Sequence, residues 1–524
     1  MDTMERDAVA EAQPADKLPV PIAALIGVLA VAAALAAGHF VAGFVGPTAS
    51  PFLAVGNSAI DLTPESLKSF AIRNFGSNDK VVLLSGMAVT MLLVAVVAGL
   101  LSRRKPLPGL VIAGALGLVA IAAVLNRPDG GQLAVLAPIA SLAAAIGVFR
   151  WLHLVATSRF TAESAHDQGL SRRRFLYSSA GVAVGAGVLG GVGQFLSGRV
   201  DVEGSRAGVG SLRPKVPAPA IPNTADFSAI GSSKFITSNE KFYRVDTALT
   251  VPRLRAEDWK LRVHGLVDNE RTFDFGDIRD RDLVEKTITM TCVSNEVGGP
   301  YVSTANFIGV PVRDLLLEAG VPNRSAWVFS TSVDGWTTAT PVADLLDEER
   351  GALLAIGMNG EALPLEHGFP ARLVVPGLYG YASATKWVVD LELITEGAKK
   401  FYWEERGWAT RGPIKTQSRI DFPVGFGNVP AGKVQVAGVA WAQTVGIDKV
   451  EVRMDGGPWQ AAELATEVND RTWRQWRTEF DLGSGSHRVE VRATDRNGNT
   501  QTPDRVPPIP DGATGWHLIQ FSVD

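Results

Sequence analysis

The chain has 524 residues, a mean hydropathy of +0.13 and a formal net charge of −4. This charge gives no indication of nucleic-acid binding, and the positive hydropathy is too apolar for a purely soluble enzyme. Because Cys292 is the only cysteine, disulfides, zinc cages, iron–sulfur clusters and covalently attached haem are excluded within one chain.

Long apolar runs with few charges dominate the first third of the chain. Each of the first four approaches or exceeds the roughly 20 residues that a helix needs to cross a bilayer, whereas the fifth is shorter and rich in glycine. We therefore predict an all-α transmembrane region of about five helices over 1–198, surrounded by membrane lipid. The runs are 21–46, 81–101, 107–125, 133–155 and 180–196.

Positive charges predict the orientation of these helices. Arg103, Arg104 and Lys105 lie between the second and third runs, and Arg159 and 172–174 lie between the fourth and fifth. The positive-inside rule places both loops in the cytoplasm. Five crossings then leave everything after about residue 197 outside, so we predict a multi-pass protein of the cell (inner) membrane with an extracytoplasmic C-terminal part.

Two features of the helical region bear on export and electron transfer. The segment Ser171–Leu176 (SRRRFL) resembles a twin-arginine export signal placed inside the chain, with ordinary cytoplasmic charge as the alternative. His39 and His153 stand at different depths of the predicted bundle, so we expect no haem between them. The helices are then an anchor, or a docking surface for a separate redox partner such as a cytochrome or a quinone-linked protein.

The remaining chain changes texture three times. Residues 199–232 are rich in Pro, Gly and Ser, which predicts an extended linker without a packed core. Strands alternate with short helices such as 312–319 and 342–346 across 233–425, an α+β pattern. Short alternating strands, with a turn at 455–457, predict a β-sandwich over 426–524. The fold class is therefore multi-domain, with an all-α, an α+β and a β-sandwich part.

Cys292 ends the alternating segment 287–292, which predicts a half-buried strand before the turn-forming run 295–299. A thiolate at a strand end, followed by permissive backbone, suits a soft transition metal. The alternative is a small buried cysteine that only packs.

A set of short segments, all in the right order, moves this choice toward the metal. Together they resemble the molybdopterin domain of the sulfite oxidase family. The segments are 242–246 (FYRVD), 259–265 (WKLRVHG), 291–295 (TCVSN), 333–336 (VDGW), 357–364 (GMNGEALP), 367–372 (HGFPAR), 375–377 (VPG) and 386–387 (KW).

The resemblance implies a molybdenum ion bound by Cys292 and by one molybdopterin. It also implies that the C-terminal sandwich is immunoglobulin-like, a domain that often mediates dimerisation in this family, so a homodimer is possible. The residues that match the family's cofactor contacts are Arg244 and Asp246 beside the metal pocket, Asn295 in the turn after Cys292, Asp334 near the pterin ring system, and His367, Arg372 and Lys386 at the pterin.

The substrate end of the pocket departs from true sulfite oxidases. Arg244 matches one of their arginines, but the other two fall on Glu296–Val297 and on 511–513, and are missing. Trp408 takes the place of their tyrosine, and an indole donates one hydrogen bond but cannot relay a proton. Sulfite as substrate is therefore in doubt, although Arg406, Arg411 or Lys415 could restore some charge.

These observations predict a membrane-anchored molybdenum oxidoreductase that transfers an oxygen atom and two electrons on a small sulfur–oxygen substrate, with Arg244, Cys292 and Trp408 at the reacting end. The site does not show the direction of the reaction. One alternative is a reductase of sulfoxides, including methionine sulfoxide. The other is a non-catalytic membrane-assembly protein that kept the fold.

Overall fold

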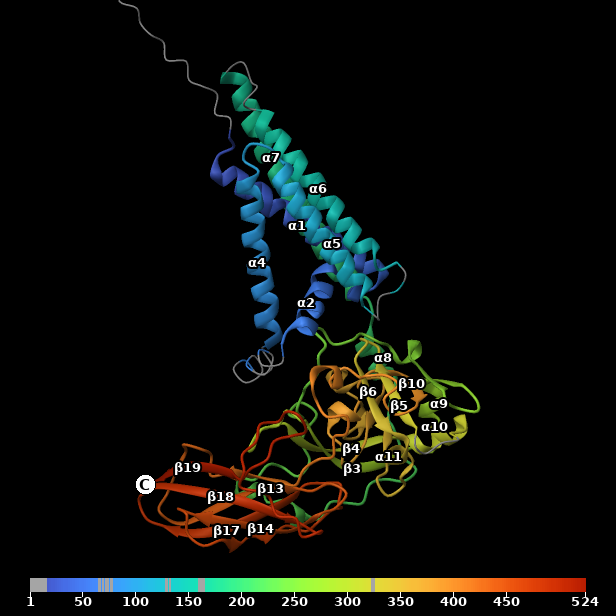
Figure 1. The fold of residues 1–524 in the computed structure, drawn as a ribbon, viewed down its shortest axis with the longest axis vertical. Helices are drawn as coiled ribbons and strands as arrows, with labels where there is room; N and C mark the ends of the chain where they lie inside the picture. The colour runs from blue at the N-terminus through green and yellow to red at the C-terminus, as the bar shows by residue number, and fades with distance from the viewer. Residues whose placement is uncertain are drawn as a thin grey trace, which may run out of the picture. The chain divides into compact units, whose positions relative to one another are not determined.

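The computed structural model describes residues 17–64, 79–127, 133–158, 165–321 and 326–524, together with the single positions 67, 70, 75 and 131. The chain forms two compact units, Met1–Arg199 and Val200–Asp524, which are treated separately below (Figure 1).

The first unit is helical, as predicted. Five of its helices are long and apolar enough to cross a membrane: α1 (Val20–Val45), α4 (Asp79–Leu101), α5 (Leu107–Leu125), α6 (Leu136–Thr157) and α7 (Ala165–Ser197). Helix α2 (Pro51–Leu62), also in the described part of this unit, was not predicted. It starts with a proline at its first turn, where the missing N–H costs nothing.

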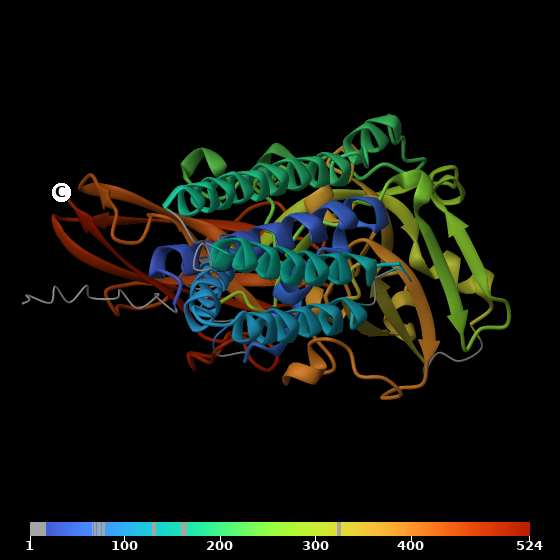
Figure 2. The same cartoon turned by 90° about the horizontal axis from the view of Figure 1, so that it is seen from above.

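Helix α1 is the centre of this unit and packs against α4, α6 and α7 (Figure 2). Small residues let the backbones of α1 and α4 approach closely. A Cβ atom added at Gly27 would lie 1.9 Å from the carbonyl oxygen of Ala95, and one at Gly99 would lie 2.0 Å from that of Ala23. These two contacts therefore require glycine.

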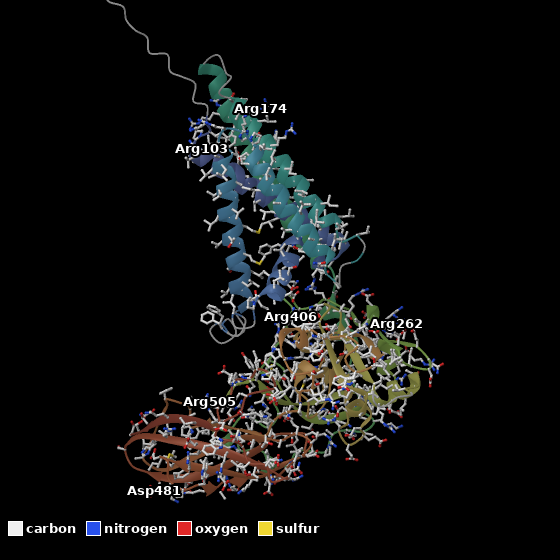
Figure 3. All side chains as sticks on the ribbon, viewed as in Figure 1. Arg103, Arg174, Arg262, Arg406, Asp481 and Arg505 are labelled. Atoms are coloured by element: carbon white, nitrogen blue, oxygen red, sulfur yellow. The ribbon has the colours of Figure 1, made fainter. Side chains whose placement is uncertain are left out.

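Polar groups of the first unit bear on the predicted orientation and on the two histidines. Arg103 and Arg174 lie at the same end of the unit (Figure 3), as the predicted cytoplasmic charges require. Arg159 lies outside the described residues. The histidines have separate partners, since His39 Nε2 lies 3.1 Å from Gln194 Oε1 and His153 Nε2 lies 2.7 Å from the Ser102 carbonyl oxygen.

The stretch 199–232 differs from the loose linker that we expected. Val202, at the start of α8 (Val202–Gly208), and Leu212 are buried in the core of the second unit. The amide of Lys215 donates to the Leu283 carbonyl at 2.7 Å, and the amide of Glu285 donates to that of Val216 at 2.8 Å. Two buried apolar side chains and these backbone hydrogen bonds therefore fix this segment, in spite of its prolines.

The α+β part of the second unit contains two sheets, with strand orders β2-β1-β10-β5-β6 and β3-β4-β7-β8; β9 also pairs with β7. The short helices α10 (Val312–Ala319) and α11 (Val342–Leu346) have the predicted bounds, and α9 (Phe275–Arg279) carries a capping box. The strands are β1 (Lys260–Gly265), β2 (Arg271–Asp274), β3 (Val284–Thr291), β4 (Val302–Pro311), β5 (Trp327–Ser332), β6 (Thr337–Pro341), β7 (Leu353–Met358), β8 (Glu361–Ala362), β9 (Arg372–Val374) and β10 (Val388–Ile394).

The C-terminal part is a β-sandwich, as predicted. Its sheets have the orders β11-β13-β17-β16 and β12-β19-β18-β14-β15 and enclose one apolar core. Because β11 belongs to the first sheet, strand pairing starts before the expected boundary at 426. The strands are β11 (Gln417–Phe422), β12 (Asn428–Val429), β13 (Gly432–Trp441), β14 (Ile447–Met454), β15 (Gln460–Ala461), β16 (Glu463–Leu464), β17 (Arg474–Leu482), β18 (Gly485–Asp495) and β19 (His517–Val523).

Candidate active site

Cys292 directly follows β3, as the sequence predicted, and its amide donates to the Tyr301 carbonyl at 3.0 Å. The expected half-burial of this strand is wrong, because every residue from Thr287 to Thr291 is buried. Two of the three threonine hydroxyl groups on this buried face have partners, whereas Thr291 Oγ1 has none among the described residues. Thr287 Oγ1 donates to Asn306 Oδ1 at 2.8 Å, and Thr289 Oγ1 lies 2.5 Å from Thr304 Oγ1.

The thiol of Cys292 lies where the strand meets the turn. The residue is half-buried and unbonded to any other cysteine, and Sγ lies 2.9 Å from Ser294 Oγ. Burial raises the pKa of the thiol, while the Ser294 contact and the charge of Lys386 oppose this effect. A thiol with a raised pKa becomes a thiolate when a metal ion binds it. Cys292 is half-buried as a residue and lies at a strand end, which separates it from cysteines that only fill a core.

Asn295 orders the turn after Cys292, which is the role that the sequence suggested. The backbone N–H of Asn295 donates to the Cys292 carbonyl at 3.1 Å, and its side-chain Oδ1 accepts from the backbone N–H of Tyr301 at 2.8 Å. A Cβ atom at Gly299 would lie 2.6 Å from that Oδ1 atom. The Gly-rich sequence of the turn is therefore needed for this hydrogen bond.

Arg244, Asp246 and Lys386 form one ionic cluster. Asp246 Oδ2 accepts from Lys386 Nζ at 2.8 Å and from Arg244 Nε at 3.0 Å, and the Asp246 side chain is 4% exposed. Lys386 Nζ also donates to the Glu366 carbonyl at 3.0 Å and lies 4.6 Å from the centroid of the Trp387 ring. Burial lowers the pKa of Lys386 to about 8, although Asp246 works against this shift.

Arg372 is the least compensated charge of the site. Its residue is 5% exposed, and its Nη1 donates to the His367 carbonyl at 3.1 Å. Within the described part of the chain, no carboxylate pairs with its guanidinium group. Burial lowers its pKa to about 10. A buried guanidinium without an anion is costly, so this position fits an anionic group.

His367 and Gly368 bring these cations together. His367 Nε2 lies 2.8 Å from the Asn239 carbonyl, so this nitrogen carries the hydrogen; burial lowers the pKa of His367 to about 4. Gly368 has a φ of 112°, and a Cβ atom there would lie 3.1 Å from Arg372 Cβ and 3.2 Å from Lys386 Cβ. Glycine therefore allows the segment at 367–372 to pack against Lys386.

Asp334 lies in the turn between β5 and β6, where its Oδ1 accepts from the Trp336 amide at 3.2 Å. The adjacent Val333 amide donates to the Trp387 carbonyl at 2.9 Å. The Asp334 turn therefore adjoins the Lys386–Trp387 segment, while its contact with the pterin ring system stays a prediction.

Trp408 lies in an aromatic cluster that also contains Val293, the residue after Cys292. Its ring centroid is 5.7 Å from that of Tyr381 and 6.0 Å from that of Trp403. The residue is 6% exposed, and its Nε1 has no hydrogen-bond partner among the described residues. A buried N–H without a partner is uncommon, and a ligand oxygen that reached this atom would supply one.

The three cations considered as substitutes for the missing arginines have other partners. Arg406 Nη1 lies 3.6 Å from Glu405 Oε2, and Arg411 Nη2 lies 3.5 Å from Glu396 Oε1. Lys415 Nζ donates to Asp511 Oδ1 at 2.8 Å and to the Gly512 carbonyl at 2.7 Å. They add little free positive charge to the substrate end.

Two tyrosines near the thiol, the half-buried Tyr243 and the buried Tyr379, were missed in the sequence. Burial raises the pKa of Tyr243 and of Tyr379, and the negative charge of a Cys292 thiolate adds to both effects. Tyr243 precedes Arg244 in a matched segment, and Tyr379 follows the matched segment 375–377, so their positions were available as a signal.

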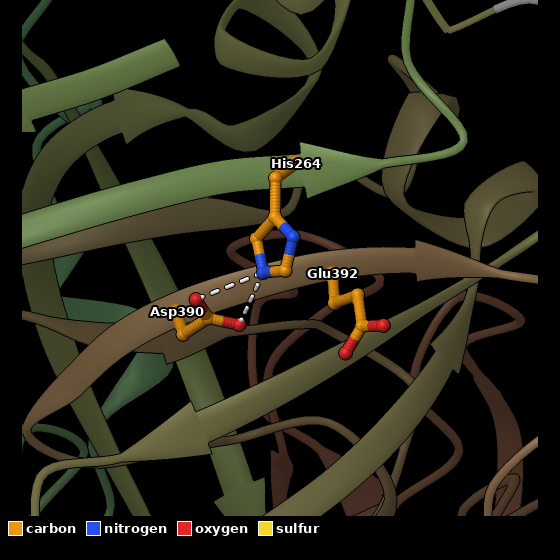
Figure 4. Close-up of side chains that lie close together, drawn as sticks. All are labelled: His264, Asp390 and Glu392. Carbon is orange, nitrogen blue, oxygen red and sulfur yellow. Dashed lines mark hydrogen bonds and ion pairs between the residues drawn. The ribbon is translucent and has the colours of Figure 1, made fainter. Parts of the chain in front are cut away.

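A separate cluster joins β1 to β10 on the other sheet. The two carboxylate oxygens of Asp390 lie 3.1 and 3.0 Å from His264 Nε2, with Glu392 beside them (Figure 4). Glu392 is paired with Lys399. These contacts fit a structural role for His264.

The buried cations and the thiol at the strand end fit a molybdenum–pterin group. An anionic pterin phosphate would supply the negatively charged partner that Arg372 lacks, with His367 and Lys386 beside it. Cys292 supplies the sulfur ligand that a soft metal prefers. The individual roles of these residues stay predictions.

Comparisons with known proteins agree with this chemistry. Residues 248–403 match the oxidoreductase molybdopterin binding domain. The chain is 36% identical over 154 residues to the uncharacterized oxidoreductase YuiH of Bacillus subtilis, covering 29% of this chain and 74% of that protein. It is 29% identical over 344 residues to human mitochondrial sulfite oxidase, covering 56% of this chain.

The chain spans 62% of the length of human sulfite oxidase. Among solved structures, the sulfane dehydrogenase SoxCD of Paracoccus pantotrophus matches 54% of this chain and 79% of its own chain, with 24% identity and a TM-score of 0.47. On the YuiH match and the molybdopterin-binding domain, the chain belongs to the sulfite oxidase family of molybdopterin-dependent oxidoreductases.

Proposed function

We propose that this protein is a membrane-anchored molybdopterin-dependent oxidoreductase that catalyses two-electron oxygen-atom transfer on a small sulfur–oxygen substrate. The observation that carries the proposal is the buried Arg372 guanidinium, which has no carboxylate partner in the described chain and lies in one cluster with His367 and Lys386. A chain without an anionic cofactor would gain nothing from burying this charge.

Each side chain has a distinct part in the proposal. Cys292 is the protein ligand of the metal, and Asn295 holds its turn in place. Arg372, His367 and Lys386 bind the pterin, Asp334 contacts its ring system, and Arg244 and Asp246 border the metal pocket. When bound, the cofactor supplies the exchange of an oxygen atom and two electrons; the protein supplies charge, orientation and the shape of the pocket.

The substrate pocket favours a neutral sulfoxide as the second candidate substrate. Lys415 is paired with Asp511, and Arg406 Nη1 lies 3.6 Å from Glu405 Oε2, so few unpaired cations remain for a dianion such as sulfite. The Trp408 N–H has no partner among the described residues and would donate to a sulfoxide oxygen that reached it. Reduction of a sulfoxide consumes two protons and two electrons and releases a sulfide and water. The electrons would come from a separate redox partner, a cytochrome or a quinone-linked protein.

The five apolar helices support a multi-pass protein of the inner membrane with its catalytic unit outside the cytoplasm. The common end of Arg103 and Arg174 supports this orientation. The twin-arginine segment Ser171–Leu176 is the proposed export signal. The C-terminal sandwich, proposed to be immunoglobulin-like, is the proposed surface for a homodimer.

Metal analysis of the purified full-length protein tests the proposal, with the substitution Cys292→Ser as the critical variant. We expect about one molybdenum and one pterin in each wild-type chain. The variant should keep the wild-type fold by circular dichroism and lose turnover in a screen of sulfite against sulfoxides. Wild-type protein without molybdenum and pterin would favour the non-catalytic alternative, and an active Cys292→Ser variant would overturn the ligand assignment.

A further inference from the structure

The strand that carries Cys292 lies at the edge of its sheet. β3 pairs with β4 on one side, in a register that runs from Val284 opposite Gly309 to Thr291 opposite Val302. The backbone groups on its other side need partners, because unpaired groups in a buried strand are costly. At the start of the strand, Val216 and Lys215 supply these partners.

The C-terminal sandwich supplies the partners for the second half of β3. The Thr289 amide donates to the Arg471 carbonyl at 3.0 Å, and the Thr289 carbonyl accepts from Gln443 Nε2 at 2.7 Å. Asn469 Nδ2 donates to the Thr287 carbonyl at 3.2 Å, and the Trp473 amide donates to Thr289 Oγ1 at 2.7 Å. These groups come from the ends of β13 and β17 and replace a neighbouring strand.

The sandwich also contacts the far end of the Cys292 turn. Arg419 Nη1 donates to the Gly299 carbonyl at 3.0 Å, and Arg419 Nε is paired with Asp421 at 2.6 Å. Gly298 packs so tightly against His517 that an added Cβ atom would lie 2.2 Å from the ring. The His517 ring is fixed in turn, since its Nδ1 accepts from the Ile420 amide at 2.9 Å.

We infer that the sandwich positions the Cys292 thiol: Gln443 and Asn469 hold the strand before it, and Arg419 and His517 hold the turn after it. This inference rests on the proposed function for the role of the thiol as a metal ligand. The position of the thiol in the fold does not depend on that function. Strand and turn are then held by a second domain that is distant in sequence. The named side chains are positioning residues, since they act through the backbone of β3 and its turn.

The lone cysteine allows a direct test, because every thiol signal from this chain reports on Cys292. Full-length protein is prepared in detergent from cells that cannot make the pterin, and the rate of reaction with an aromatic disulfide is measured. The test variant is Gln443→Met with Asn469→Ala, which removes two hydrogen bonds to β3. The control variant is Gln435→Met with Asn428→Ala, whose side chains bond within the sandwich to Glu479 and Asp524.

We expect the test variant to react about tenfold faster than the wild type, since two lost hydrogen bonds ease local opening of the strand end. The control variant should stay within about twofold of the wild type. Equal rates for the two variants would overturn the inference. So would an increase in rate that matches the loss of global stability in denaturant, because that result would mean whole-domain unfolding.

Two further experiments test the same inference. If the double variant does not fold, Asn469→Ala alone is compared with Asn428→Ala, and equal labelling rates again overturn the inference. In the cofactor-loaded protein, the electron paramagnetic resonance signal of the half-reduced metal should shift in the test variant only. A wild type without molybdenum would defeat the proposed function, whereas faster labelling of the test variant would still support the placement of the thiol.

Discussion

Replacement of Arg372 by methionine should stabilise the cofactor-free protein and prevent it from retaining the cofactor. The reason is that the guanidinium is buried with carbonyl partners only, within the described chain. Methionine is similar in length and has no charge to desolvate. A residue whose removal raises stability but abolishes binding is one that the fold keeps for its ligand.

The expected magnitude follows from the pKa of Arg372. Burial lowers it from 12.5 to about 10, which corresponds to about 3 kcal/mol against the charged form in the folded state. At pH 7 the arginine is charged in both the folded and unfolded states, so the folded state bears this whole cost, which is relieved only above about pH 10. The variant also loses the hydrogen bond to the His367 carbonyl, which lowers its stability by about 1 kcal/mol. The net gain is about 2 kcal/mol.

Denaturant unfolding of the cofactor-free full-length protein, followed by tryptophan fluorescence, measures this gain, and metal analysis of loaded protein measures retention. The matched control is Arg350→Met, because Arg350 is paired with Asp344 at 3.0 Å and donates to the Pro376 carbonyl at 2.7 Å. This control should lower stability and leave molybdenum content unchanged. A less stable Arg372→Met variant that retains its molybdenum would refute the reasoning.

Three further predictions concern the substrate, the cofactor and the membrane. Trp408→Phe should lower kcat/KM for sulfoxides by about tenfold in steady-state assays, as one lost hydrogen bond implies, while Trp476→Phe, which removes another unpartnered buried N–H in the sandwich core, should not. Retention of the cofactor should fall as the pH rises through about 8, because Lys386 loses its proton there; a profile that is unchanged in Lys386→Met would contradict this. In a Cys292→Ser background, a membrane-impermeant maleimide added to spheroplasts should label Asn497→Cys but not Lys105→Cys, and the reverse pattern would reject the proposed topology.

Local patterns were sufficient to predict much of the fold. The apolar runs predicted five helices because their length and lack of charge depend on the local sequence alone. The helices at 312–319 and 342–346 were predicted as part of the local alternation of strands and short helices, and the alternating segments after 432 predicted the strands of the sandwich. The candidate site residues could also be proposed from the sequence, because they occur in short segments whose order resembles a known family.

Contacts between distant segments could not be predicted. The linker at 199–232 has a composition typical of an extended chain, yet Val202 and Leu212 find space in a core built from later residues. The alternation in β3 indicated one exposed face, but Asn306, Thr304 and the sandwich cover it. The residues that cover 199–232 and β3 are distant in the sequence. A pattern within one segment therefore predicted the wrong burial for both.

The charges of the site connect cofactor binding to folding and to export. A buried, unpaired Arg372 and a Lys386 whose pKa is lowered to about 8 both weaken the folded state until an anion arrives. A ligand that binds only the folded chain adds RT ln(1 + [L]/Kd) to its stability. The folded, loaded protein is then the form that should leave the cytoplasm, which gives the proposed twin-arginine segment a physical purpose. The sandwich takes part in the same coupling, because Cys292 is held in place only when both domains have folded around β3.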